Sequence, residues 1–165
     1  MPCGRKKILL IDDSPDDVEL TRRALKKSQI YNELVVIHDG ADAVEFFFDD
    51  AGNCVRSANE LPMVVLLDLS LPRVSGIEIL SKLRACESTK MMPVIILTGS
   101  PEEKERLAVD KLGFVSLVTK PIKFPEEILS IDGFSQFYNF SNRSCYNFAM
   151  RPNLIAVALN SCSNV

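Results

Sequence analysis

Five short runs of apolar residues, rich in β-branched side chains, recur along the first three quarters of the chain. Within each run the apolar residues are continuous and do not alternate with polar ones, which is typical of parallel strands covered on both faces. The runs occupy residues 7–12, 34–39, 63–68, 93–98 and 114–120. We therefore expect five strands, each buried between two layers.

The stretches between these runs show the spacing of amphipathic helices, and they cover residues 14–28, 40–52, 75–88 and 100–113. The first stretch begins with a predicted N-cap at Ser14 and has Pro15 in its first turn. We expect its core-facing stripe to contain Val18, Leu20 and Leu25. Strands that alternate with helices predict an α/β fold, namely a doubly wound, five-stranded parallel sheet with helices on both faces.

Polar residues end four of the five predicted strands. Asp12 and Asp13 end the first strand, Asp68 the third, Thr98 the fourth and Lys120 the fifth. In a doubly wound sheet, ligands bind beyond the carboxyl ends of the strands. We therefore expect these five residues to meet at one edge of the sheet.

This set of side chains predicts a particular chemistry. Three carboxylates in one cleft repel one another unless a cation joins them, and hard oxygen ligands suit Mg²⁺. Lys120 would supply a positive charge to a phosphoryl oxygen, and Thr98 would supply a hydroxyl donor. Asp68, at the centre, could then act as a nucleophile that forms an acyl phosphate.

Composition narrows the class of protein. The chain has 165 residues, 47% of them apolar and 25% charged, with a net charge of −3, so we expect one domain of ordinary size and no nucleic-acid partner. The apolar runs are too short to cross a bilayer, so we expect no membrane association. Five cysteines without pairing or metal spacing indicate reduced thiols in a cytoplasmic protein, and a single histidine argues against a histidine-based metal site.

Four motifs at the predicted strand ends carry a resemblance to a known family. They are "IDDSPDD", "LLDLSLPRVSG", "ILTGS" and "VTKP". Over about residues 6–130 the chain resembles the receiver (CheY-like) domains of two-component response regulators. The segment "NELVVIHDGADAVEFFF" and the long loop after it look like the small single-domain regulators that partner bacterial phytochromes.

The resemblance implies a role for each acid. Asp68 would accept a phosphoryl group from a phosphohistidine on a sensor histidine kinase, here a phytochrome-type kinase. Asp12 and Asp13 would hold Mg²⁺ together with Asp68 and the backbone carbonyl of Ser70. Ser70 would also flank the opening to the phosphoryl site.

The resemblance also implies roles for residues at the fourth and fifth strand ends. Thr98 would move toward the phosphoryl oxygen, and Lys120 would pair with the phosphoryl group. The peptide bond before Pro121 would be cis and would place the lysine. Gly99 would leave room for the phosphoryl group, and Ser100 would flank the opening.

Simpler explanations exist for some of these residues. Asp12 and Asp13 could serve only as caps of the helix that follows them, with no role in metal binding. We interpret Asp16 and Asp17 as acids that favour the helix N-terminus and add solubility. Leu117 stands where the family usually has a tyrosine or phenylalanine that swings inward, so an aromatic switch is not expected here.

We divide the chain into a receiver domain, 1–130, and an atypical C-terminal extension, 131–165. Three explanations of the extension remain open: an arm that docks on its own domain or forms a homodimer, a disordered tail, or a shifted reading past a normal family ending. The chain after Pro121 is too short for a DNA-binding output domain, so we expect output through protein–protein contact, with the downstream target unidentified.

Two other functions remain as alternatives. One is a degenerate receiver that binds a partner and is never phosphorylated. The other is an enzyme, a phosphotransferase or phosphatase that uses an aspartyl phosphate. A phosphatase of that kind would need a second acid two residues after its nucleophile, and Ser70 occupies that position, so we expect no enzymatic activity on other substrates.

Overall fold

Five parallel strands form one sheet in the computed structural model, which describes residues 7–28, 30–99 and 115–122. The strands are β1 (Ile8–Ile11), β2 (Leu34–Ile37), β3 (Val64–Asp68), β4 (Val94–Thr98) and β5 (Val115–Thr119). Their order in the sheet is β2-β1-β3-β4-β5. This order is that of a doubly wound sheet, as the apolar pattern predicts.

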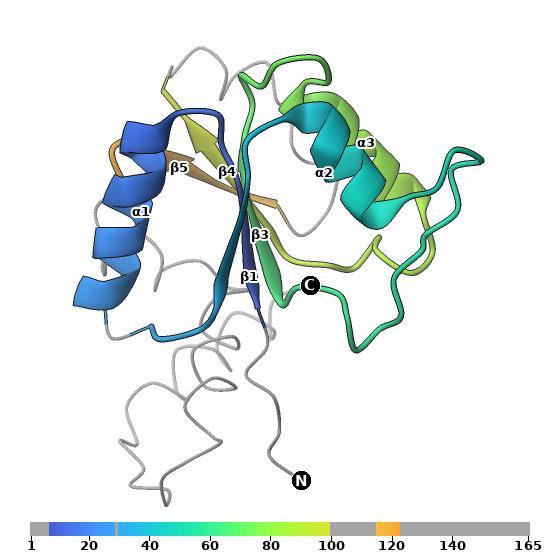
Figure 1. Ribbon diagram of the computed structural model, residues 1–165, viewed down its shortest axis with the longest axis horizontal. Coiled ribbons are helices and arrows are strands. Elements are labelled where there is room, and N and C mark those ends of the chain that lie inside the picture. The colour runs from blue at the N-terminus through green and yellow to red at the C-terminus, as the bar shows by residue number, and fades with distance from the viewer. Residues whose placement is uncertain (1–6, 29, 100–114, 123–165) are drawn as a thin grey trace, which may run out of the picture.

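Helices cover both faces of the sheet, as expected. They are α1 (Pro15–Lys27), α2 (Gly40–Phe47) and α3 (Gly76–Ala85). Figure 1 shows α1 against one face and the α2–α3 pair against the other. The helix predicted over 100–113 and the extension over 131–165 lie outside the described residues.

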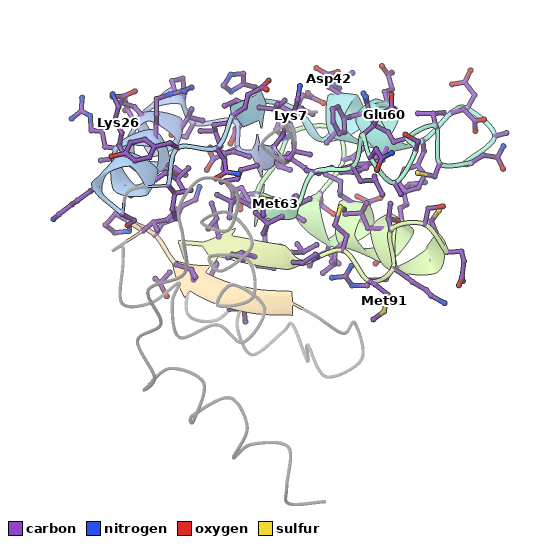
Figure 2. The ribbon with its side chains drawn as sticks, turned by 90° about the horizontal axis from the view of Figure 1, so that it is seen from below. Lys7, Lys26, Asp42, Glu60, Met63 and Met91 are labelled. Atoms are coloured by element: carbon purple, nitrogen blue, oxygen red, sulfur yellow. The ribbon has the colours of Figure 1, made fainter. Side chains whose placement is uncertain are left out.

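The central strands are buried on both sides because their alternate residues enter two different cores. In β1, Leu9 and Ile11 belong to the cluster that contains Phe47 of α2, while Leu10 belongs to the cluster that contains Val18 of α1. In Figure 2, the label Lys26 lies at α1 on one side, and the label Met91 lies near α3 on the other side. The continuous apolar runs in the sequence reflect this two-sided burial.

Each described helix begins at a side-chain cap. Ser14 accepts a hydrogen bond from the Asp17 N–H, as the predicted N-cap of α1 should, and Asp39 caps α2 by accepting from the Ala41 N–H. Ser75 and Glu78 form a reciprocal capping box at α3. Because each cap lies soon after a strand end, it fixes where the chain turns away from that edge.

Two expectations about the helices are wrong. The second helix ends at Phe47 and does not continue to residue 52, because Phe48 is extended and forms an antiparallel bridge with Cys54. Leu20 is 46% exposed and does not belong to the core stripe of α1, which contains Thr21 instead. Leu20 lies two residues after Val18, which is roughly 200° around the helix.

None of the described helices is long and apolar enough to cross a membrane.

Candidate functional site

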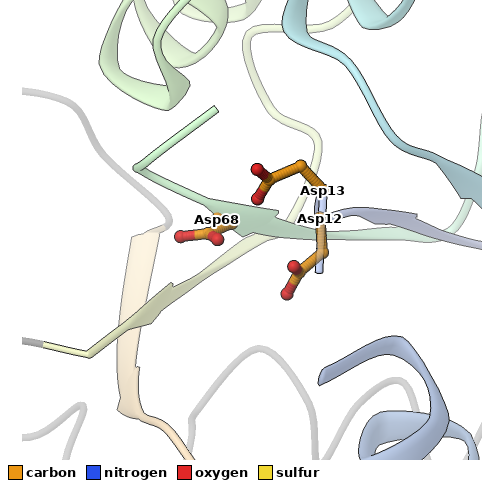
Figure 3. Close-up of side chains that lie close together, drawn as sticks. All are labelled: Asp12, Asp13 and Asp68. Atoms are coloured by element: carbon orange, nitrogen blue, oxygen red, sulfur yellow. The ribbon is translucent and has the colours of Figure 1, made fainter. Parts of the chain in front are cut away.

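Three carboxylates gather where β1 and β3 end. Asp12 and Asp13 directly follow β1, and Asp68 is the last residue of β3. The two strands are neighbours with Ile11 level with Leu67, so Asp12 and Asp68 reach the same edge together. One carboxylate oxygen from each of the three residues lies within 4.8 Å of the others (Figure 3).

The three carboxylates differ in exposure, and backbone N–H groups orient two of them. Asp12 is fully buried, Asp68 is 7% exposed and Asp13 is exposed. The Ser14 N–H donates to Asp12 Oδ1 at 3.0 Å, and the Ser70 N–H donates to Asp68 Oδ1 at 3.2 Å. The N-cap of α1 is Ser14, so Asp12 and Asp13 do not cap that helix themselves.

Lys120 joins this cluster from the end of β5. Its Nζ lies 2.8 Å from a carboxylate oxygen of each of Asp12, Asp17 and Asp68. The contacts with Asp17 and Asp68 are hydrogen bonds. The contact with Asp12 Oδ2 satisfies the distance of an ion pair only, so this buried oxygen accepts no hydrogen bond from the described residues.

Burial and charge act in opposite directions on these groups. Burial raises the pKa of Asp12 above its usual value, although Lys120 and the Ser14 N–H oppose that rise. Burial alone would lower the pKa of Lys120, but its contacts with the carboxylates of Asp12, Asp17 and Asp68 together raise it above its usual value. Lys120 therefore carries its charge throughout the physiological range.

The donor set fits a small, hard divalent cation. Three carboxylates supply oxygens within 4.8 Å of one another, and a buried oxygen of Asp12 lacks a hydrogen bond from the described residues. Mg²⁺ prefers such oxygen ligands and retains several waters, for which the exposed side of Asp13 leaves access. The cluster of Asp12, Asp13 and Asp68 can therefore bind Mg²⁺, whereas a ligand role for the Ser70 carbonyl stays a prediction.

Thr98 and its neighbours approach the site from the end of β4. Thr98 is fully buried, and its carbonyl accepts the Lys120 N–H at 2.8 Å, which ties the ends of β4 and β5 together. The Lys120–Pro121 peptide bond is cis, as the resemblance implies. A Cβ added to Gly99 would meet no atom of the described residues within 4 Å.

The remaining predicted positions are placed as follows. Leu117 is half-buried and packs against the core cluster on the α2–α3 face. Ser70 is exposed at the start of the loop after β3. Ser100 lies outside the described residues.

Asp17 is a site residue that sequence reasoning missed. Its sequence position indicates a helix-terminal acid, but its carboxylate contacts Lys120, which is 103 residues away in the chain. A signal did exist in the periodicity, because Asp17 shares a helix face with Thr21 and Leu25, which are both buried. An acid on the core-facing side of the first turn lies close to the end of β1.

Comparison with known proteins finds a matching family and similar sequences. The model of the response regulator receiver domain family matches residues 8–131. Response regulator Rcp1 of Synechocystis sp. is 32% identical over 133 residues, which cover 81% of this chain and 88% of Rcp1.

Solved structures of similar proteins share the fold. The bacteriophytochrome response regulator RtBRR is 31% identical with a TM-score of 0.63, over 94% of this chain and 89% of its own. The phosphorylated cyanobacterial phytochrome response regulator RcpA is 27% identical with a TM-score of 0.58, over 84% and 90%. The Mn(2+)-bound form of response regulator Rcp1 is 32% identical with a TM-score of 0.57, over 81% and 94%. The chain therefore belongs to the response regulator receiver domain family.

Proposed function

We propose that Asp68 accepts a phosphoryl group from a phosphohistidine of a sensor histidine kinase in a Mg²⁺-dependent reaction. The observation that carries this proposal is the Lys120 ammonium, 2.8 Å from Asp68 Oδ2 at the edge of the acid cluster. The similarity to RcpA, which was solved in a phosphorylated form, and to Rcp1, solved with Mn²⁺, supports it.

The proposed reaction is a displacement at phosphorus. An oxygen of the Asp68 carboxylate forms a bond to phosphorus while the phosphorus–nitrogen bond of the phosphohistidine breaks. The electron pair of that bond returns to the imidazole nitrogen, and the product is an aspartyl phosphate. Bound Mg²⁺ would neutralise phosphoryl charge during the transfer.

The other residues would hold the groups in place. Lys120 would give a charge-assisted hydrogen bond to a phosphoryl oxygen, and Thr98 would donate its hydroxyl to another. Asp12 and Asp13 would hold the metal beside Asp68. Water would later attack the phosphorus, release inorganic phosphate and restore the Asp68 carboxylate. In this proposal the chain is a signalling protein and does not process other substrates.

The kinase that we propose is a phytochrome-type light sensor. The support is the similarity to RtBRR and RcpA, which are described as bacteriophytochrome and cyanobacterial phytochrome response regulators. The phosphorylated chain would signal by protein–protein contact in the cytoplasm, since an aspartyl phosphate adds negative charge that can reorder nearby hydrogen bonds.

We also propose the division into a receiver domain over 1–130 and an extension over 131–165, supported by the family match to residues 8–131. A homodimer formed through the extension is part of this proposal. The size of the full chain and of a version ending at residue 130, measured by light scattering, tests it. Equal oligomeric states would contradict a dimer arm.

The test of the phosphoacceptor uses the full chain with Mg²⁺ and acetyl phosphate as the donor. Intact mass spectrometry should find one added phosphoryl group, and the substitution Asp68→Asn should abolish it. Asp16→Asn is the matched control, because it removes an exposed carboxylate outside the cluster and should label like the wild type. Hydroxylamine should remove the label, as expected for an acyl phosphate.

Two results would contradict the proposal. Equal labelling of the wild type and Asp68→Asn would place the phosphoryl group elsewhere. No labelling of the wild type by acetyl phosphate or by a phosphorylated phytochrome-type kinase would favour a receiver that only binds a partner.

A further inference from the structure

The Lys120 ammonium touches a carboxylate that the metal cluster does not include. Of its three carboxylate neighbours, Asp12 and Asp68 belong to the group whose oxygens lie within 4.8 Å of one another. Asp17 lies outside that group, yet its Oδ2 accepts a hydrogen bond from Lys120 Nζ at 2.8 Å. This pair therefore does not depend on the oxygens that a metal would use.

A cation in the cluster changes the balance of charge around Lys120. Mg²⁺ on Asp12, Asp13 and Asp68 would neutralise two of the carboxylates that now hold the ammonium, and its positive charge would repel the ammonium. Only an acid outside the metal ligands keeps its full attraction for Lys120 in that state. Among the three carboxylates in contact with Lys120, Asp17 is that acid.

Helix α1 fixes where Asp17 points. The Asp17 N–H donates to the Ser14 cap at 3.3 Å, Thr21 one turn further along is buried, and Leu25 packs in the core cluster with residues of the sheet. The side chains of Asp17 and Lys120 are 33% and 15% exposed. The pair is therefore partly shielded from water, and its attraction is stronger than that of a surface ion pair.

We propose that Asp17 is a positioning residue that anchors the Lys120 ammonium, so that the remaining N–H donors face Asp68 and the incoming phosphoryl group. This inference rests on the proposed phosphorylation of Asp68 and deepens it. Asp17 acts through Lys120 and does not contact the phosphoryl group or the metal itself. Its neighbour Asp16 is exposed, lies in the same first turn and offers a matched control.

The experiment compares Asp17→Asn with Asp16→Asn in the full chain, and both changes remove one negative charge from the same helix N-terminus. Asp17→Asn should slow phosphorylation by acetyl phosphate about tenfold, the factor for loss of one charge-assisted hydrogen bond. Asp16→Asn should leave the rate within about twofold of the wild type, because it removes only a remote charge. Isothermal titration should give the two variants similar Mg²⁺ affinities.

A second readout observes the anchor directly. The side-chain ¹⁵N NMR signal of Lys120, assigned by its loss in Lys120→Arg, should remain separate from the signals of the exposed lysines when Mg²⁺ is added to the wild type. In Asp17→Asn the signal should move toward those of the exposed lysines, and in Asp16→Asn it should not. The wild-type measurement does not depend on the folding of Asp17→Asn.

The outcomes separate the two proposals. If the wild type is phosphorylated and Asp17→Asn matches Asp16→Asn in rate and in the Lys120 signal, the anchor is overturned and the proposed function stands. If the wild type is not phosphorylated, the proposed function fails. In that case, a Lys120 signal unchanged by Asp17→Asn also overturns the anchor, and a shifted signal supports an anchor without phosphoryl transfer.

Discussion

Arg73 joins the loop after β3 to the start of α2. Its Nε donates to Asp39 Oδ2 at 2.7 Å and an Nη donates to Asp42 Oδ1 at 2.6 Å. Asp39 also caps α2 by accepting the Ala41 N–H, so one carboxylate serves both contacts. Arg73 has a φ of 63°, a left-handed backbone conformation that residues other than glycine rarely adopt. The loop that follows Asp68 is thus held by a side chain whose own backbone is strained.

This ion pair predicts a pH dependence. The Arg73 hydrogen bond lowers the pKa of Asp39, so the pair stabilises the fold above the ordinary pKa of an aspartate and loses this effect as the pH falls through the lowered value. Arg73→Ala should therefore raise the pKa of Asp39, measured by ¹³C NMR of its carboxyl group. It should also lower the melting temperature at neutral pH by more than at acid pH.

The chain offers an internal reference for this measurement. The pKa of Asp49 is also lowered, by hydrogen bonds from Asn53, and these do not involve Arg73. The Asp49 titration should therefore be the same in Arg73→Ala and in the wild type. If Asp39 titrates unchanged in the variant, the Arg73 contact does not control its pKa.

At the scale of elements, helices α2 and α3 each begin with a glycine pressed against the loop after β3. A Cβ on Gly40 would meet the carbonyl of Val74, and a Cβ on Gly76 would meet the carbonyl of Asp68 and the Cα of Leu69. The Gly76 N–H also donates to the Leu69 carbonyl at 3.1 Å. The helix starts are therefore in direct backbone contact with the segment that carries the proposed acceptor.

We expect Gly76→Ala to lower the free energy of unfolding by about 1–3 kcal/mol, because the backbone of β3 or α3 must shift to admit the methyl group. Urea unfolding measures this change, and the same shift should slow labelling of Asp68 by acetyl phosphate. Gly99→Ala is the control, since no described atom lies within 4 Å of its added Cβ, and its stability should change by less than about 0.5 kcal/mol. Equal losses in the two variants would show that close packing at Gly76 is not the cause.

The sequence predicts elements better than it predicts contacts between them. The five strands and three described helices follow from apolar runs and spacing, because two-sided burial leaves a local record in the chain. The end of α2 at Phe47 was missed, since it depends on a bridge between Phe48 and Cys54. The Asp17–Lys120 contact was missed because its partners come from α1 and the end of β5, and no local pattern relates them.

At the scale of the whole molecule, the parallel sheet concentrates acids at one edge. Asp12, Asp17 and Asp68 share the Lys120 ammonium, and Asp13 lies in the same cluster as Asp12 and Asp68. Repulsion within the cluster opposes folding when no cation is bound. We therefore expect the stability of the fold to depend on a cation bound at these strand ends.

We expect Mg²⁺ to stabilise the full chain through this cluster. At 100 times the dissociation constant, binding to the folded state alone adds about 2.7 kcal/mol to the free energy of unfolding. Thermal unfolding with MgCl₂, against NaCl of equal ionic strength, should show a higher melting temperature for the wild type and for Asp16→Asn. Asp13→Asn should lose most of the Mg²⁺ effect, and because Asp13 is exposed, the substitution leaves the core intact. A full Mg²⁺ effect in Asp13→Asn would mean that the cation binds elsewhere. Loss of the Mg²⁺ effect in Asp13→Asn but not in Asp16→Asn would show that the stability of the whole sheet depends on the acids at its edge.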